Sequence, residues 1–352
     1  MRTKAQLYAL LAAALFGVSA PFAKLLLRNL QPLQLSGLLY LGSGVGLLLY
    51  RVSRGLVAGP GHRQAALRKA DVGWLIGAVI CGGLLAPAVL MYSLSRTPAA
   101  VASLLLNFEA VSTTFIAAVF FSEQTGKRLW LAIAVITIAS LILTVDKTGA
   151  WGLSFGSLGV LAACFLWGID NNLTSHISGK DPVMIVIVKG LGAGSFALVL
   201  SFGIGSSLTS YSTVFLALLL GCLSYGVSLL LFILALRDLG SSRASALFGT
   251  APFLGAVVSF VAFRYVPSTQ FLISVPVMLL GAFLLVRESH SHLHLHTNVA
   301  HEHPHTHDEH HDHAHDDGIE HLSEEHSHAH KHEKLQHEHE HAPDIHHRHE
   351  HH

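Results

Sequence analysis

The chain has 352 residues, of which 51% are hydrophobic and only 12% are charged. Soluble globular domains carry about 25% charged residues, so this composition excludes that class and indicates a membrane protein. Residues 1–289 contain 8 acidic and 19 basic residues, a net charge of +11, whereas residues 290–352 contain 14 acidic and 3 basic residues, a net charge of −11. The second segment also holds 25 of the 27 histidines. The sequence therefore consists of a basic hydrophobic body and an acidic, histidine-rich tail.

Apolar stretches follow one another through the whole body. A bilayer core of about 30 Å requires roughly 20 apolar residues per helix, because lipid offers no hydrogen bonds to the backbone. Ten stretches reach or approach this length, and they predict helices at residues 6–27, 32–50, 72–94, 99–121, 129–145, 157–172, 182–202, 213–236, 242–263 and 270–286. The expected fold class is an all-α membrane protein with ten transmembrane helices.

Basic residues in the connections predict the orientation of these helices. With the N-terminus inside, thirteen Lys and Arg residues of the connections fall on the inner side and five on the outer side. Cytoplasmic loops are normally enriched in Lys and Arg, so both termini are expected in the cytoplasm. The expected location is the plasma (inner) membrane.

Internal repetition divides the body into two halves. Leu15-Phe16-Gly17 recurs as Leu166-Trp167-Gly168, an offset of 151, and residues 94–110 align with residues 236–252 at an offset of 142. Five helices per half is an odd number, so the second half enters the membrane from the opposite side. We expect two inverted five-helix repeats, residues 1–150 and 151–289, with a solute site between them near the midplane, and a disordered tail over residues 290–352.

Short motifs recur in a fixed order along both halves. In the first half they are Leu15-Phe16-Gly17 with Lys24, Tyr92-x-Leu94-x-x-x-Pro98-Ala99, Asn107-Phe108-Glu109 and Phe121-Ser122-Glu123; in the second half they are Leu166-Trp167-Gly168, Ala235-Leu236 through Ala244, Pro252 and Phe263. This order resembles the EamA-type family of the drug/metabolite transporter superfamily, over about residues 5–287. The resemblance implies a ten-helix carrier with cytoplasmic termini that exports amino acids, metabolites or drugs. Ala110 and Tyr265 stand where the family usually has proline and glutamate.

Glu109 is the first candidate for a functional residue within the membrane. A charge at the centre of a bilayer costs at least about 2.5 kcal/mol, so such residues are rare and functional by default. Ser112 and Thr113 follow Glu109 by three and four positions and share its face of the helix. The pattern predicts a carboxylate that couples transport to protons or binds a cation in a central cavity. The alternative is a neutral glutamate hydrogen-bonded across helices.

Asp170, Asn171 and Lys189 are the remaining polar candidates of the transport path. Asp170 stands beside Asn171 near the inner end of the sixth stretch, where it either contributes to the site or pairs with Lys180 at the interface. Lys189 lies within the seventh stretch, where it either pairs with an acidic residue or extends its ammonium group to the inner face.

The tail carries histidines at alternate positions. Neutral imidazole is a good ligand for zinc, nickel and cobalt, and neighbouring carboxylates support such sites. The tail has too little apolar sequence to fold alone, so we expect it to be disordered until a metal crosslinks it. The candidate ligands are His290, His292, His294, His296, His301, His303, His305, His307, His326, His328, His330, His332, His337, His339 and His341. The alternative is a solvated polar tail that titrates near pH 6.5.

These features predict a secondary transporter that exports a small metabolite or drug-like solute and requires no cofactor for transport itself. Histidine and cysteine are sparse in the body, so a metabolite or drug-like cargo is favoured over a transition metal as the cargo. The alternative of a different class is a membrane-tethered metal buffer or sensor, in which the tail binds metal and the helices transport nothing. Gly152-Leu153-Ser154-Phe155-Gly156 has the spelling of a nucleophile elbow but joins two membrane helices, so we do not expect an enzyme. The expected partners are the lipid bilayer, a small-molecule solute and divalent transition metal ions, but no nucleic acid; a homo-oligomer stays open.

Overall fold

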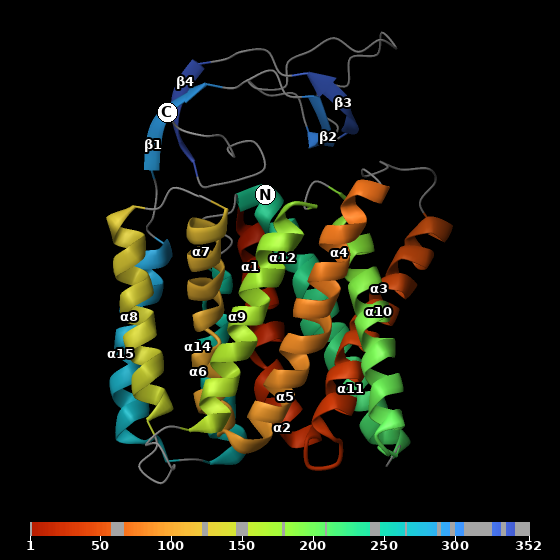
Figure 1. Cartoon of the computed structure of the whole chain (residues 1–352), viewed down its shortest axis with the longest axis vertical. Coiled ribbons are helices and arrows are strands. Elements are labelled where there is room, and N and C mark those ends of the chain that lie inside the picture. Colours follow the sequence, from red (N-terminus) through yellow and green to blue (C-terminus); the bar gives the residue numbers. More distant parts are fainter. Residues whose placement is uncertain are drawn as a thin grey trace.

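The computed structural model is a bundle of long helices with four short strands beyond one end (Figure 1). The structure describes residues 2–57, 67–121, 126–145, 154–177, 180–207, 210–239, 247–264, 266–286, 290–295, 300–305, 326–331 and 336–341. The helices up to residue 144 are α1 (Arg2–Gly17), α2 (Ser19–Leu26), α3 (Pro32–Val57), η1 (Lys69–Asp71), α4 (Val72–Ala78), η2 (Val79–Leu85), α5 (Ala86–Arg96), α6 (Ala99–Leu105), α7 (Phe108–Phe120) and α8 (Lys127–Thr144). Those that follow are α9 (Phe155–Ser175), α10 (Pro182–Gly203), α11 (Tyr211–Gly221), η3 (Cys222–Val227), α12 (Ser228–Leu239), α14 (Ala251–Phe263) and α15 (Thr269–Val286).

Seven helical segments of the described chain are long and apolar enough to cross a membrane, judged by length and composition. They are Thr3–Leu26, Pro32–Arg54, Lys69–Arg96, Ala99–Phe120, Lys127–Thr144, Pro182–Gly203 and Tyr211–Phe232. Three further helices pack among them: α9 against α5 and α7, α14 against α1 and α6, and α15 against α8. The ten predicted stretches thus correspond to seven segments that meet this test and three packed helices that do not, and a count of ten spans stays a prediction.

Two of the predicted stretches are interrupted. The stretch 99–121 is divided into α6 and α7 by a turn at Leu106 and Asn107, where the Glu109 amide bonds to the Leu106 carbonyl at 3.1 Å. The stretch 242–263 is helical in α14 only from Ala251, after a turn at Gly249 and Thr250. Pro252 lies in the first turn of α14, where a residue without an amide hydrogen is tolerated. Neither stretch is therefore the single continuous helix that the apolar pattern predicts.

The order of helix starts and interruptions repeats along the chain. Equivalent pairs are Pro32 of α3 with Pro182 of α10 (offset 150), Val79 of η2 with Cys222 of η3 (143), Phe108 of α7 with Ala251 of α14 (143) and Lys127 of α8 with Thr269 of α15 (142). The packing is paired in the same sense, because α1 lies against α12 and α14 while α9 lies against α5 and α7. The repetition seen in the sequence is thus a repetition of local structure, including a π-helix at the same point of each half.

Small residues allow the two halves to approach closely. A Cβ atom on Gly190 of α10 would lie 2.6 Å from the backbone nitrogen of Gly44, and one on Gly194 would lie 2.5 Å from that of Leu41 in α3. A Cβ on Gly42 would overlap the backbone of Leu218 in α11. The Gly-x-x-x-Gly spacings 42–46 and 190–194 therefore serve helix packing, as small residues do in membrane proteins.

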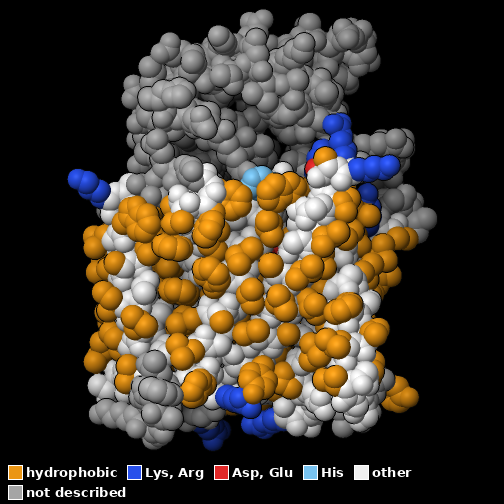
Figure 2. Space-filling view, in the orientation of Figure 1, with side chains coloured by type: hydrophobic (Ala, Val, Ile, Leu, Met, Phe, Trp, Pro, Cys, Tyr) orange, Lys and Arg blue, Asp and Glu red, His pale blue; other side chains and the backbone are white. Residues whose placement is uncertain are grey.

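The sides of the bundle are hydrophobic and its ends are basic. Figure 2 shows hydrophobic side chains over the lateral surface, with Lys and Arg gathered toward the two ends. The side chains of Val261 in α14 and Val199 in α10 are 76% and 71% exposed. Exposure of many such apolar side chains to water would be unfavourable. This distribution is the one expected of a protein surrounded by lipid.

Four strands lie in the tail, at the end of the bundle where α1 begins (Figure 1). They are β1 (His290–Leu295), β2 (Ala300–His305), β3 (His326–Lys331) and β4 (Gln336–His341), and β1 pairs with β4 and β2 with β3, both antiparallel. The disordered tail that the sequence predicts stays a prediction. The histidines alternate with other residues in each strand, a period of two, which is the period of a β-strand.

Candidate functional site

Glu109 lies in the first turn of α7, directly after the turn that separates α7 from α6. The Asn171 amide of α9 donates to Glu109 Oε1 at 3.0 Å and to Thr113 Oγ1 at 3.0 Å. Thr113 Oγ1 in turn donates to the Glu109 carbonyl oxygen at 2.9 Å. The start of a helix favours negative charge, because its amide groups point toward that end. The break between α6 and α7 thus creates a polarised position for a carboxylate inside the bundle.

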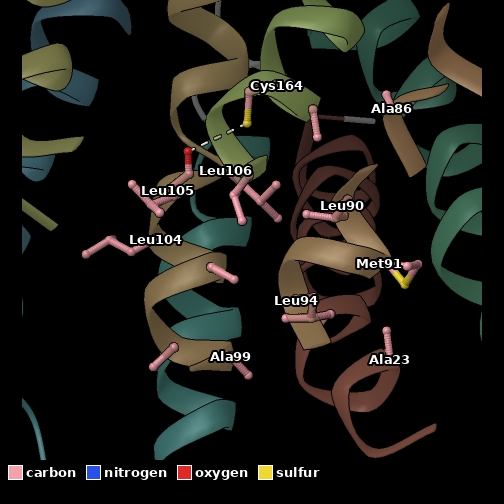
Figure 3. Close-up of a cluster of buried hydrophobic side chains, with 14 of the residues drawn as sticks. Ala23, Ala86, Leu90, Met91, Leu94, Ala99, Leu104, Leu105, Leu106 and Cys164 are labelled. Atoms are coloured by element: carbon pink, nitrogen blue, oxygen red, sulfur yellow. Dashed lines mark hydrogen bonds between the residues drawn. The ribbon is translucent and has the colours of Figure 1, made fainter. Parts of the chain in front are cut away.

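The break itself is held by side chains from the helix and its neighbour. Asn107 donates its amide to the Leu104 carbonyl at 2.9 Å. Cys164 of α9 is fully buried, and its Sγ lies 3.7 Å from the Leu105 carbonyl, as the dashed line in Figure 3 marks. A buried carbonyl group at the end of a helix has no hydrogen-bond partner within that helix, so it needs a donor from elsewhere. Leu104, Leu105 and Leu106 are buried at this point and belong to the large apolar cluster of the bundle (Figure 3).

Asp170 and Lys189 form an ion pair between α9 and α10. Lys189 Nζ lies 2.7 Å from both carboxylate oxygens of Asp170, and the two side chains are 14% and 6% exposed. Thr174 Oγ1 donates to Asp170 Oδ1 at 3.0 Å. Of the two alternatives open for each residue, the structure selects this pair over a contact of Asp170 with Lys180 and over extension of Lys189 to the surface.

The predicted polar residues therefore lie along α9, which packs against α7 and is joined to α10 by the Asp170–Lys189 pair. Glu109, Thr113 and Asn171 are joined by hydrogen bonds, and Asp170 precedes Asn171 on α9. Ser112 is also at this contact, but its role differs: it is buried against Gly168 of α9, and its hydroxyl has no hydrogen-bond partner among the described residues. The α7 helix belongs to the first half of the chain and α9 and α10 to the second, so the cluster bridges the two halves.

Gly82 is a site residue that the sequence reading missed. It lies in the π-helix η2, and its carbonyl oxygen accepts hydrogen bonds from the Tyr40 hydroxyl at 2.6 Å and from Trp167 Nε1 at 3.1 Å. A Cβ atom on Gly82 would overlap the Asp170 carboxylate. π-Helical turns within helices are frequent at functional sites. The sequence signals were Gly82-Gly83 inside an apolar run and Trp167 in the repeated Leu166-Trp167-Gly168 motif.

Aromatic rings adjoin this cluster. The Tyr40 and Tyr225 rings are 5.7 Å apart, and Phe16 lies 5.9 Å from Tyr225 and 5.5 Å from Phe248. These rings come from α3, η3, α1 and the segment before α14. The sequence indicated only Phe16, through its motif, because aromatic residues are common in membrane helices.

Metal ligands are sparse where the structure describes side chains. No group of three or more His, Cys, Asp and Glu residues that could hold an ion occurs there. His176 at the end of α9 instead stacks on Trp74 at a ring separation of 4.2 Å, and its Nδ1 lies 2.9 Å from the Asn172 carbonyl. Of the predicted tail ligands, twelve lie on β1 to β4, and His296, His307 and His332 lie outside the described residues.

The bundle and its buried polar cluster define a helical membrane transporter, and comparison with known proteins gives its family. The model of the EamA-like transporter family matches residues 3–145 and again residues 154–287, so the chain belongs to that family. An uncharacterized transporter of Methanothermobacter thermautotrophicus (strain ATCC 29096 / DSM 1053 / JCM 10044 / NBRC 100330 / Delta H) is 27% identical over 287 residues, which are 78% of this chain and 83% of the relative. A solved crystal structure, 18% identical, covers 82% of this chain and 98% of its own with a TM-score of 0.59, which shows the same fold.

Proposed function

We propose that the protein is a secondary carrier that exports a small metabolite or drug-like solute by alternating access. In this proposal ten helices cross the plasma membrane as two inverted repeats, and both termini face the cytoplasm. The cluster of Glu109, Asn171, Asp170 and Lys189 is the solute and coupling-ion site. Support comes from its position at the contact between helices of the two halves, which is where inverted-repeat carriers hold their solutes.

One observation carries the assignment of Glu109. Lys189 already neutralises Asp170, with both carboxylate oxygens engaged. Glu109, in contrast, receives a neutral amide from Asn171, and no ion pair to it is found among the described side chains. An intramembrane carboxylate without a fixed cation is available to take up a proton or a cationic group. Glu109 is therefore the exchangeable charge of the site, and the Asp170–Lys189 pair is its fixed neighbour.

The difference between the neutralised Asp170 and the exchangeable Glu109 matters during alternating access. When α7 and α9 move apart, the bonds from Asn171 to Glu109 and Thr113 break, and the carboxylate becomes open to a proton from one side. Solute binding and protonation then compete for Glu109, which couples their movements in opposite directions. The sparse metal ligands among the described side chains favour an organic solute over a metal cargo.

Transport in proteoliposomes tests this function. Counterflow with a panel of amino acids, metabolites and divalent metals should give exchange above that of empty vesicles for at least one organic solute. Glu109→Gln should abolish the response of that exchange to a pH gradient while leaving the protein folded. Asp71→Asn, at the surface turn η1, removes a carboxylate far from the cluster and serves as the matched control. An unchanged pH response in Glu109→Gln would exclude the coupling role, and exchange of metals alone would favour the metal carrier.

The tail has a separate regulatory role in this proposal. Its net charge of −11 attracts it to the basic inner face of the carrier at separations below a Debye length of about 8 Å. Zinc, nickel or cobalt bound by the histidines adds positive charge and weakens that attraction, which frees the inner opening. Transport measured against free zinc should respond in the intact protein but not in a protein that ends at Ser289. Identical responses of the two proteins would leave the tail as a store, the role of a membrane-tethered buffer.

A further inference from the structure

Three aromatic side chains meet at the end of the bundle where α1 begins. The ring of His176, which directly follows α9, stacks on the Trp74 ring of α4 with 4.2 Å between the centroids and an angle of 8° between the planes. The ring of Phe121, which directly follows α7, lies 5.0 Å from the His176 ring at an angle of 50°. We call these three side chains the aromatic stack. Because α4 and α7 belong to the first half of the chain and α9 to the second, the stack joins the two halves.

A hydrogen bond fixes the position of the His176 ring. Its Nδ1 lies 2.9 Å from the Asn172 carbonyl oxygen, which can only accept, so Nδ1 carries the hydrogen. The side-chain amide of Asn172 in turn donates to the Thr113 carbonyl of α7 at 3.0 Å. The contact of α7 with α9 that brings Asn171 to Glu109 thus continues through Asn172 to His176. The polar cluster and the aromatic stack are therefore two parts of one contact between the halves.

Each ring of the stack belongs to a helix that also contributes to the polar cluster. His176 follows Asn171 of α9 by five residues, and Phe121 follows Thr113 of α7 by eight. At 1.5 Å per residue these separations are about 8 and 12 Å along the helices. Trp74 lies in α4, which runs directly into η2. All three rings lie toward the end at which α4 begins and α7 and α9 end, so the aromatic stack covers the cluster on that side (Figure 1).

The internal repeat shows that the fold forms without such a stack. At the offsets of 151 for α9 and 143 for the other elements, the equivalents of the three residues at the opposite end of the bundle are Leu25, Ala217 and Arg264. None of them has an aromatic ring, although α2 packs against α11 and α14 there as α9 packs against α4 and α7. The aromatic stack is therefore a property of one end and not a requirement of helix packing.

We propose that the aromatic stack is a lid over the entrance to the polar cluster at the N-terminal end of the bundle, the inner side in the proposed orientation. This inference rests on the proposed carrier and adds the contact that has to break when its inner side opens. Trp74 is 38% exposed and His176 is exposed too, so the rings can part without opening the apolar core. An aromatic pair changes an equilibrium constant by about two- to 13-fold, which is weak enough for a lid that opens repeatedly.

Chemical access to the cluster tests the lid. Thr113→Cys places a thiol in the cluster of a protein whose natural cysteines, Cys81, Cys164 and Cys222, are replaced by serine. Its modification by a charged, membrane-impermeant methanethiosulfonate is measured from each side of sealed vesicles, and protease access to an N-terminal tag identifies the N-terminal side. From that side Trp74→Ala should raise the rate about two- to 13-fold, the effect of one lost aromatic pair. His176→Ala removes both ring contacts and should raise the rate further. From the opposite side neither variant should raise it.

Matched variants separate the lid from other roles of these rings. His176→Phe keeps a ring between Trp74 and Phe121 and should leave the rate near that of the parent protein. Trp130→Ala is the control, because Trp130 is 42% exposed in the first turn of α8 and its ring contacts only Phe115 of α7, in the same half, among the ring pairs of the described residues. This variant should leave the rate unchanged. A rise equal to that of Trp74→Ala would overturn the lid, since loss of any exposed tryptophan would then explain both results.

The outcomes distinguish the lid from the carrier. Unchanged labelling in Trp74→Ala and His176→Ala would overturn the lid and leave the carrier intact, because counterflow measures transport separately. A rise from both sides of the membrane would indicate unfolding instead of opening and would also overturn the lid. Labelling that rises only from the N-terminal side, without counterflow of any solute, would overturn the carrier and support the lid as the cover of the polar cluster.

Discussion

Lys189 holds both carboxylate oxygens of Asp170 at 2.7 Å, so the two charges neutralise each other between α9 and α10. Both side chains are largely buried. A buried pair of this kind contributes little net stability compared with an apolar pair, but the loss of one partner leaves an uncompensated charge. Single and double substitutions of Asp170 and Lys189 should therefore affect the stability of the protein differently.

Removal of one partner should destabilise the protein strongly. Asp170→Asn or Lys189→Met alone should lower the free energy of unfolding by about 3–5 kcal/mol, because a charge is left in the bundle. The double variant should be more stable than either single variant, since no charge remains. Thermal unfolding in detergent measures this order. A double variant no more stable than the worse single variant would contradict a direct ion pair.

Gly82 should not tolerate even a methyl group. Gly82→Ala places a Cβ atom on the Asp170 carboxylate, so either the ion pair or η2 has to shift. We expect a loss of about 1–3 kcal/mol in stability, typical of overpacking, together with a lower transport rate. Gly73→Ala is the control, because a Cβ there meets nothing within 4 Å. Equal behaviour of the two variants would mean that Gly82 does not position Asp170.

The Thr113 hydroxyl should contribute to transport through its two hydrogen bonds and not through the volume of the side chain. It accepts from Asn171 and donates to the Glu109 carbonyl. Thr113→Val keeps the volume and removes both bonds. At about 0.5–1.5 kcal/mol per bond the loss is about 1–3 kcal/mol, so transport should fall by about five- to 150-fold. Thr113→Ser keeps the hydroxyl and should restore most of the rate. If valine and serine variants transport equally well, the hydroxyl has no part in the site.

The body should function without the tail. The family match ends at residue 287, so a protein that ends at Ser289 retains every helix of the matched region. Its thermal unfolding temperature should equal that of the intact chain, because the removed segment contributes no helix of the bundle. Its transport in metal-free buffer should persist, at a rate no lower than that of the intact chain, whose tail then hinders the inner opening. Failure of this shorter protein to insert into membranes, or loss of all its transport, would show that tail and body are one unit.

Much of the site could be predicted from the cost of charge in lipid. Glu109, Asp170 and Lys189 are conspicuous because charged residues are so unfavourable in apolar stretches. The repeats could also be predicted, because the motifs Leu15-Phe16-Gly17 and Leu166-Trp167-Gly168 can be found by comparing the two halves of the sequence. The apolar stretches did not predict the turn before Glu109 or the turn before α14. An apolar run does not record where a helix breaks, because turn residues such as Leu106 are themselves apolar.

The sequence by itself determined that this protein enters the membrane, that it does so as two related halves, and that a few polar groups go with it, because hydrophobicity and charge are properties of single residues and short segments. Only the tertiary structure decided which of those groups meet. The sequence contains several acidic residues that could pair with Lys189, and Gly82 has no charge that would indicate a functional role. Their assignment to Asp170 depends on how closely α9, α10 and η2 pack, and that distance is set by the combined shape of many small side chains.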